Sequence, residues 1–312
     1  MHRVLYITSP ADPVTEQVRL ASSGKLDLAA VSSDSVPQSL DGFDAVLVGD
    51  EPLPTPLAST GDNVPKLVQL TRGHHRDVDA AALSDAGITV TGASPVLAPH
   101  IADYCTGQIS KLLDRTGFAG LKIGIIGIGR VGTVMADQCA RLGATVFYSD
   151  IRTPMHGSAS SFRRITMDML LSTCDVVSLH AQWDKSASNP LIRERELRLM
   201  GAHSVLINAA DARLVDNAAL AGSLSRSEIG GAVLDIERPA ADLFEGMSNV
   251  KLSPYTAARS AGSDAAVARF VMENITAALA GDTPAGIVET IGLPRAGDPA
   301  FWASKMYPRS AR

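Results

Sequence analysis

The sequence lacks the cysteine pattern of a disulfide framework, an excess of basic residues, a long apolar run and any internal repeat. Its three cysteines are scattered without metal-ligand spacing, and an odd number argues against structural disulfides. The net charge of −5 provides no basic face for nucleic acid. No run of roughly 18 apolar residues is present, and the opening stretch has too few apolar residues for a signal peptide. We therefore expect a cytoplasmic protein that binds neither nucleic acids nor membranes.

The length of 312 residues is enough for one large or two medium domains. Arginine outnumbers lysine by 21 to 7, a bias typical of a GC-rich bacterial genome. That bias carries no information about a substrate.

A glycine-rich stretch, KIGIIGIGRVG, combines a buried strand with a tight turn. Its apolar β-branched residues suit a strand covered on both faces. Gly127, Gly129 and Gly132 follow in G-x-G-x-x-G spacing, and Val131 to Leu142 is expected to form a helix. The first glycine permits the turn, the second lets a pyrophosphate approach, and the third lets the helix pack closely on the strand. The helix N-terminus offers N–H groups to phosphates, so the stretch predicts a dinucleotide site.

An acidic residue, Asp150, follows the next expected strand, Ala144–Tyr148. A carboxylate at this distance past the glycines is suited to hold the hydroxyls of the adenosine ribose. It would repel a ribose 2′-phosphate, so we predict NAD rather than NADP as the cofactor. Arg152, two residues later, weakens that preference without reversing it.

Strand and helix patterns alternate along the remaining chain. Residues 1–92 are typical of a small flavodoxin-like α/β domain, and a long helical pattern begins at Pro99. The strands expected in the first domain are Val4–Ile7, Leu28–Val31, Ala45–Val48, Leu67–Leu70 and Ile88–Thr91. Those expected after the glycine-rich unit are Val176–His180, Ser204–Asn208, Ala232–Asp235 and Val250–Leu252. The second set predicts a doubly wound parallel sheet, and a final helix at Ser263–Ala280 returns the chain to the first domain.

Several further segments make the chain similar to the D-isomer-specific 2-hydroxyacid dehydrogenases, which include formate, glycerate and phosphoglycerate dehydrogenases. Besides the glycine-rich stretch, these segments are DVDAAALSDAGITVT (77–91), DVVSLH (175–180), VLINAADARLVD (205–216), GAVLD (231–235) and NVKLSP (249–254). The resemblance implies an α/β fold of two domains, with a Rossmann-type domain at 97–267 inserted into a flavodoxin-like substrate domain. That substrate domain would comprise residues 1–96 and 268–312, and the active site would lie between the two.

The resemblance also implies cofactor contacts. Arg130 and Val131 would meet the pyrophosphate through backbone N–H groups, and Asp235 would hold the nicotinamide carboxamide. A strand-end cap is the alternative role for Asp235. His180 is expected to border the cofactor, and Ala209, with its neighbour at 210, to line the nicotinamide pocket.

The catalytic positions depart from the family pattern. The family's INTARG segment carries an arginine that grips the substrate carboxylate, and here INAADA places Asp211 there. The family's T-P-H segment supplies a histidine acid/base, and here LSPYTA places Tyr255 there. The glutamate that pairs with that histidine corresponds to Ala240, so we expect Glu237 to substitute for it. Tyr255, Asp211 and Glu237 are thus the candidate catalytic residues.

These departures change the expected substrate. Asp211 would repel a substrate carboxylate at a cost of several kcal/mol, which disfavours an ordinary 2-oxo acid. A phenol donates a proton but is a poor base at neutral pH, because its ordinary pKa is about 10. The candidates for a replacement cation are Arg76, Arg213 and Arg238. The alternative for each of them is an ordinary surface arginine.

Three functions fit this pattern. The first is an NAD-dependent oxidoreductase acting on an atypical small molecule that is neutral or cationic. The second is a non-catalytic NAD-binding protein that acts as a sensor or partner module. The third is a lyase or cyclase that uses NAD transiently. The resemblance also implies a homodimer through the helix at 99–115, with a small interface because the family's dimer-arm segment is missing after that helix.

Overall fold

The computed structural model describes residues 1–37, 39–53, 64–75, 78–151, 161–183, 189–260 and 262–288. The described chain packs as two compact units, and it passes between them after Leu97 and after Ser260. The domain boundaries predicted at residues 96 and 267 stay a prediction.

The first unit contains a parallel sheet whose described strands run in the order β2-β1-β3-β4-β5. The strands are β1 (His2–Ile7), β2 (Leu26–Val31), β3 (Ala45–Val48), β4 (Leu67–Leu70) and β5 (Thr89–Thr91). This is the strand order of flavodoxin-like folds. The residues of β3 and β4 are buried throughout, as expected for parallel strands with both faces covered.

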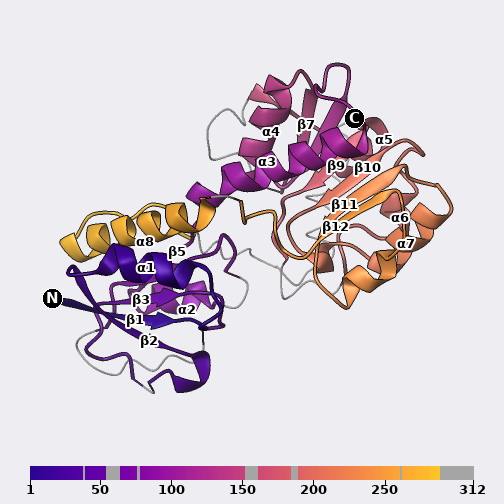
Figure 1. Ribbon diagram of the computed structural model, residues 1–312. Helices are drawn as coiled ribbons and strands as arrows, with labels where there is room; N and C mark the ends of the chain where they lie inside the picture. Colours follow the sequence, from indigo (N-terminus) through magenta and orange to yellow (C-terminus); the bar gives the residue numbers. More distant parts are fainter. Residues whose placement is uncertain are drawn as a thin grey trace. The chain divides into compact units, whose positions relative to one another are not determined.

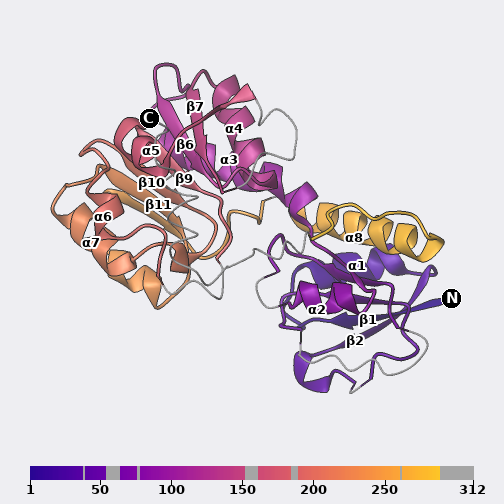
Figure 2. The same cartoon turned by 180° about the vertical axis from the view of Figure 1, so that it is seen from behind.

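Helices cover both faces of this sheet. Helices α1 (Val14–Ser22) and α8 (Ser263–Ala280) lie side by side on one face (Figures 1 and 2). Helix α2 (Ala80–Asp85) packs its Leu83 into the apolar cluster on the other face. The single turn η1 (Ser33–Ser35) follows β2.

A buried polar network anchors α8 to this sheet. Asn274 Nδ2 donates to Gln69 Oε1 at 2.8 Å and to the Ala285 carbonyl at 2.8 Å. Asn274 Oδ1 accepts from the Ala285 N–H at 3.0 Å, and Thr91 Oγ1 donates to Gln69 Oε1 at 2.6 Å. Because buried polar groups require partners, this network specifies where the returning helix docks.

The second unit contains a parallel sheet with the described order β12-β11-β10-β9-β6-β7-β8. The strands are β6 (Lys122–Ile126), β7 (Thr145–Ser149), β8 (Arg163–Arg164), β9 (Val176–Leu179), β10 (Val205–Asn208), β11 (Gly231–Asp235) and β12 (Val250–Ser253). The order changes direction at β6, which starts the glycine-rich turn. In open sheets of this kind, ligands bind beyond the carboxyl ends of the strands at such a switch point.

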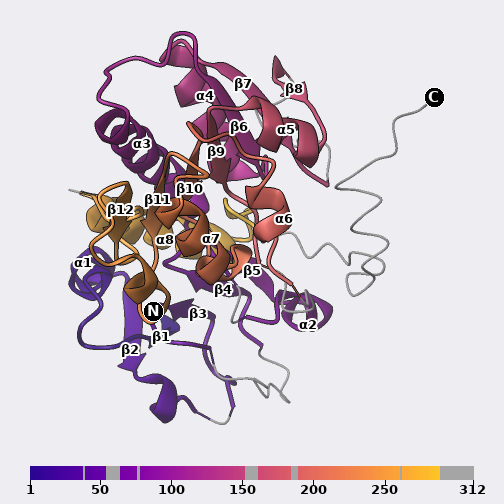
Figure 3. The same cartoon turned by 90° about the vertical axis from the view of Figure 1, so that its right-hand side faces the viewer.

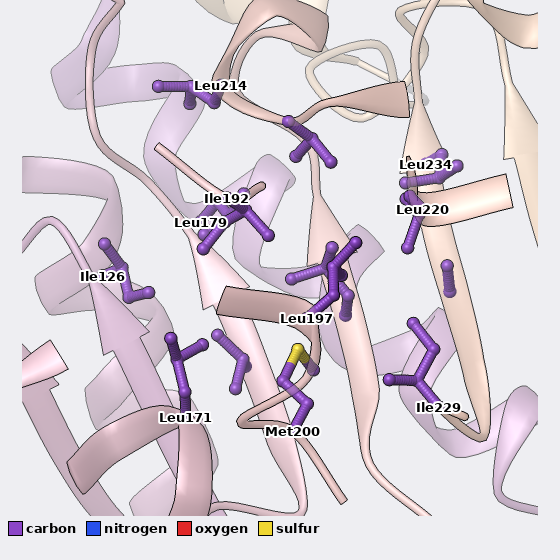
Figure 4. Close-up of a cluster of buried hydrophobic side chains, with 14 of the residues drawn as sticks. Ile126, Leu171, Leu179, Ile192, Leu197, Met200, Leu214, Leu220, Ile229 and Leu234 are labelled. Carbon is purple, nitrogen blue, oxygen red and sulfur yellow. The ribbon is translucent and has the colours of Figure 1, made fainter. Parts of the chain in front are cut away.

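Two apolar layers cover this second sheet. Helices α3 (Ser94–Leu112) and α4 (Arg130–Arg141) pack against one face, with Ile123, Ile125 and Ile207 buried between. Helices α5 (Met167–Thr173), α6 (Glu194–Leu197) and α7 (Asn217–Ser225) cover the other face, as the view along the sheet indicates (Figure 3). Figure 4 shows this second apolar layer. The strands contribute Ile126, Leu179 and Leu234 to it, and these side chains pack against those of the helices. The 3₁₀ turns η3 (Ala212–Leu214) and η4 (Ala240–Phe244) follow β10 and β11.

The fold class predicted from the sequence is confirmed, but the predicted start of one helix is wrong. Helix α3 begins at Ser94, so Pro99 lies inside it. Pro95 already lies in the first turn, where a missing N–H costs no hydrogen bond, and this was the better start signal. None of the helices in the described part of the chain has the length and apolar character that a membrane span requires.

Candidate functional site

The glycine-rich turn has the shape that a bound pyrophosphate requires. Gly127 has φ +94°, and a Cβ there would lie 2.5 Å from the Ala181 nitrogen. A Cβ on Gly132 would lie 2.0 Å from the Gly127 carbonyl oxygen. By contrast, a Cβ on Gly129 would meet nothing within 4 Å, so the backbone is open at that point. The turn is therefore closed against the protein at two glycines and open to a ligand at the middle one.

Helix α4 starts directly after this open glycine. Gly129 is its N-cap, and the Thr133 N–H is the first to bond back, to the Gly129 carbonyl at 2.9 Å. The N–H groups of Arg130 and Val131 precede that bond and have no partner within the helix. They provide, with the helix dipole, the donors that fit a dinucleotide pyrophosphate.

Asp150 lies beside this turn. It follows β7, and its Oδ2 accepts a hydrogen bond from the Ile128 N–H at 2.6 Å. The carboxylate is thus fixed next to the glycines, where a ribose would follow the pyrophosphate. Arg152, the other residue predicted here, lies outside the described residues.

His180 also borders the turn. It follows β9, its N–H donates to the Ile126 carbonyl at 2.8 Å, and the backbone of 180–181 faces Gly127. Its Nε2 is 2.9 Å from Ser178 Oγ. Burial lowers the pKa of His180 from 6.5 to about 4, so the imidazole is neutral at physiological pH.

The loop after β10 is built on a buried side-chain amide, Asn208, which was not predicted from the sequence. Asn208, fully buried, accepts at Oδ1 from the N–H groups of Ala210 (3.2 Å) and Asp211 (3.3 Å). Its Nδ2 donates to the Asp211 carbonyl at 2.9 Å. These bonds fix the partly buried Ala209 and Ala210 at the carboxyl edge of the sheet. The signal in the sequence was an asparagine at a strand end, which commonly bonds the backbone that follows.

Asp211 and Arg213 form a clamped pair on this loop. Asp211 Oδ1 accepts from the Arg213 N–H and Nε, each at 3.0 Å, and Oδ2 accepts from Nη2 at 2.8 Å. Asp211 is buried, whereas the Arg213 side chain is 48% exposed. The hydrogen bonds to Asp211 raise the pKa of Arg213. The guanidinium also lies over the Trp183 ring, 5.7 Å from its centroid, a second contact that the sequence did not reveal.

Asp235 fixes the loop that carries Tyr255. Its carboxylate accepts from the Thr256 N–H at 2.7 Å, from the Ala257 N–H at 2.8 Å and from Ser253 Oγ. Ser253 Oγ also bonds the Tyr104 hydroxyl of α3, and burial raises the pKa of Tyr104. The structure thus supports the strand-end role for Asp235, and its contact with nicotinamide stays a prediction.

The two remaining catalytic candidates lie at neighbouring strand ends. Tyr255 is partly buried and has φ +49°, in the left-handed region. It also lies close enough to Arg213 to raise the pKa of that guanidinium, after the larger effect of Asp211. Glu237 is exposed between β11 and η4. Tyr255 therefore lies near the Asp211–Arg213 pair, while the catalytic roles of all three candidates stay predictions.

Residues 98–257 match the family model for the NAD-binding domain of D-isomer-specific 2-hydroxyacid dehydrogenases. A glyoxylate reductase from Korarchaeum cryptofilum is 30% identical over 241 residues, covering 68% of this chain and 72% of that protein. One from Thermococcus litoralis is 31% identical over 177 residues, and the match spans 55% of this chain but only 53% of that relative.

A solved structure shares the fold. The NAD-complexed D-isomer-specific 2-hydroxyacid dehydrogenase of Lactobacillus delbrueckii ssp. bulgaricus superposes with a TM-score of 0.71, at 21% identity, over 93% of this chain and all of that one. The glycine turn, helix α4 and Asp150 fit NAD, and the matched domain is an NAD-binding domain. The predictions of family, fold and NAD as the cofactor are confirmed.

Proposed function

This chain belongs to the D-isomer-specific 2-hydroxyacid dehydrogenase family, and we propose that it is an NAD-dependent oxidoreductase whose small-molecule substrate is neutral or cationic at the position of the usual carboxylate. The observation that carries this proposal is the clamped pair of Asp211 and Arg213.

The charge of this pair supports the proposed substrate. A carboxylate substrate gains most from a full cation, because charge-assisted bidentate bonds are strong. Here Arg213 already directs Nε and Nη2 at Asp211, so the pair has no net charge and one bidentate face of the guanidinium is occupied. A carboxylate placed nearby would gain little from Arg213 and would be repelled by Asp211. An uncharged carbonyl or alcohol meets neither penalty. Because Arg213 already neutralises Asp211, a neutral substrate group suits the site better than a cationic one.

The remaining roles fall to residues that follow the carboxyl ends of the strands. NAD, when bound, supplies or accepts a hydride. Tyr255 donates the proton to the developing alkoxide, and Asp211 positions Arg213 beside it. Glu237 is the second carboxylate of the site. His180 is neutral and borders the cofactor, where it adds no charge.

The assembly around this site completes the proposal. Residues 97–267 form the nucleotide domain, and residues 1–96 with 268–312 form the substrate domain. The division of the described chain into units after Leu97 and Ser260 supports this arrangement. The protein acts in the cytoplasm as a homodimer through α3, with a small interface because only a short connection separates α3 from β6. Sedimentation equilibrium at twice the chain mass is the expected result.

A non-catalytic NAD-binding sensor is the second candidate. It is favoured by Asp235, whose carboxylate is already engaged by two backbone N–H groups and a hydroxyl. A carboxylate engaged in this way has little capacity left to orient a nicotinamide for hydride transfer.

Turnover and binding measured together separate the two candidates. For the oxidoreductase, Tyr255→Phe lowers kcat for NADH oxidation by about 100-fold or more, because the proton donor is lost, while NADH affinity by fluorescence titration changes less than about twofold. For the sensor, the wild type binds NADH with no oxidation by any neutral or cationic carbonyl. That second result would overturn the oxidoreductase proposal.

A further inference from the structure

Helix α3 contributes one side chain to the network behind the loop that carries Tyr255. The Tyr104 hydroxyl of α3 bonds Ser253 Oγ at the end of β12, 149 residues later in the chain. Both residues lie in the second compact unit. The contact therefore joins a strand-end loop to a helix that is far from it in sequence.

The hydrogen bonds of this network run in one direction. Ser253 Oγ donates to Asp235 Oδ1, because a carboxylate offers only acceptors. A serine hydroxyl has one proton, so Tyr104 is the donor in its bond to Ser253. Burial raises the pKa of Tyr104, which keeps the phenol protonated at physiological pH. Tyr104 thus orients the Ser253 hydroxyl toward Asp235.

Asp235 in turn holds the backbone that follows Tyr255. Asp235 and Ser253 are opposite one another in the paired strands β11 and β12. Asp235 Oδ1 accepts from the Thr256 N–H at 2.7 Å, and Oδ2 accepts from the Ala257 N–H at 2.8 Å. Tyr255 has φ +49°, a left-handed conformation that is costly for a residue with a Cβ. The two charge-assisted bonds directly after Tyr255 offset that cost.

We propose that Tyr104 is a positioning residue for the reaction, acting through Ser253 and Asp235 on the conformation of Tyr255. The proposal rests on the oxidoreductase proposed above, in which Tyr255 donates the proton. Without the Tyr104 hydroxyl, Ser253 Oγ loses its donor and the serine side chain is free to adopt other rotamers. Asp235 Oδ1 then loses a hydroxyl donor for part of the time, and the left-handed turn at Tyr255 is held less firmly.

Amide hydrogen exchange of the full-length protein tests this link without requiring turnover. Tyr104→Phe removes only the hydroxyl, and we expect the Thr256 and Ala257 amides to exchange about fivefold faster or more, because their acceptor is held less firmly. The matched control is Tyr148→Phe, the same change at a buried tyrosine of the same apolar cluster. Tyr148 lies on β7, which β6 separates from the strands of this network, so both amides should stay within about twofold of the wild type. Equal exchange in wild type and Tyr104→Phe would overturn the proposal.

Steady-state kinetics of NADH oxidation by pyruvamide separates positioning from a merely structural role. Tyr104→Phe should lower kcat by about fivefold or more and change KM for NADH by less than about twofold, because the glycine turn and Asp150 are untouched. Ser253→Ala should lower kcat at least as much. The double variant should have kcat within about twofold of Ser253→Ala alone, since Tyr104 acts only through Ser253. Effects on kcat that multiply in the double variant would show that Tyr104 acts by another route and would contradict the proposal.

The two measurements distinguish this inference from the proposal on which it rests. If the wild type reduces no carbonyl but Tyr104→Phe still speeds exchange of the two amides, the oxidoreductase proposal fails and the link from Tyr104 to the loop stands. If turnover is present and the amides exchange alike in both proteins, only the role of Tyr104 is wrong. An equal loss of kcat in Tyr148→Phe would also refute that role, because it would indicate a general loss of packing.

Discussion

Buried Asp211 accepts three hydrogen bonds from Arg213, two residues later in the chain: one from the backbone N–H and two from the guanidinium. The family resemblance gives position 211 to an arginine that grips a carboxylate. Here the cation is displaced by two residues and is held by the acid that took its place. A charge that looked like a bare carboxylate in the sequence is half of an ion pair in the fold.

Breaking this pair from either side should destabilise the protein. Arg213→Ala leaves Asp211 buried without its cation, and we expect the free energy of unfolding to fall by about 2–3 kcal/mol. Asp211→Ala should cost less, about 1–2 kcal/mol, because half-exposed Arg213 is rehydrated by water. Urea unfolding of both variants and of the double variant measures the coupling. Costs that simply add would show that the two residues do not interact.

Two glycines of the turn should respond differently to the same added methyl group. Gly132→Ala places a Cβ against the Gly127 carbonyl oxygen, so we expect a loss of roughly 2 kcal/mol or more in stability. Gly129→Ala enters open space with ordinary φ, so stability should change by less than about 1 kcal/mol. Its methyl group would instead occupy the pyrophosphate position and weaken NADH binding by about tenfold or more. Normal NADH affinity in stable Gly129→Ala would place the cofactor elsewhere.

His180 should make the protein sensitive to acid. Its pKa is lowered to about 4 in the folded chain, whereas an unfolded imidazole titrates at 6.5. Between these values the unfolded state binds more protons, so the stability contribution is fully present above pH 6.5 and is lost as the pH falls toward 4. The loss from pH 7 to pH 4.5 should be about 2 kcal/mol smaller in His180→Asn than in the wild type.

The comparison for this prediction is His203→Asn, which changes an exposed histidine in the same unit. Urea unfolding at both pH values should show the wild-type dependence for that control. An unchanged pH dependence in His180→Asn would mean that this imidazole is not desolvated.

The network around Asn274 should stabilise the first unit. Asn274→Ala removes three hydrogen bonds and leaves Gln69 and Ala285 with fewer partners, so we expect a loss of about 2–3 kcal/mol in unfolding free energy. The matched control is Glu273→Ala, an exposed neighbour on the same helix, with an expected change within about 0.5 kcal/mol. Equal effects of the two variants would assign the loss to helix propensity instead.

The sequence predicted the sheets well because their signals are local. Apolar runs that include β-branched residues mark β3 and β6, and Ser263–Ala280 matches α8 at both ends. The strand β8 escaped because Arg163–Arg164 has no apolar pattern and is an edge strand defined only by pairing with β7.

The site was predictable only in part for a related reason. The glycine turn depends on backbone geometry and Asp150 on its place directly after β7, and residue spacing encodes both. The interactions of Arg213 depend on where its side chain turns, and it was one of three candidate cations. The position of the Arg213 guanidinium depends on the turn that Asn208 builds and on Trp183, which follows β9.

The most direct measurement compares kcat/KM of the wild type for NADH oxidation by pyruvamide and by pyruvate, which differ only in an uncharged amide against a carboxylate. Because Asp211 and Arg213 form a neutral pair, the account predicts that pyruvamide is preferred by about tenfold or more. A preference for pyruvate would show that a cation still grips the carboxylate, and it would contradict the proposed substrate class.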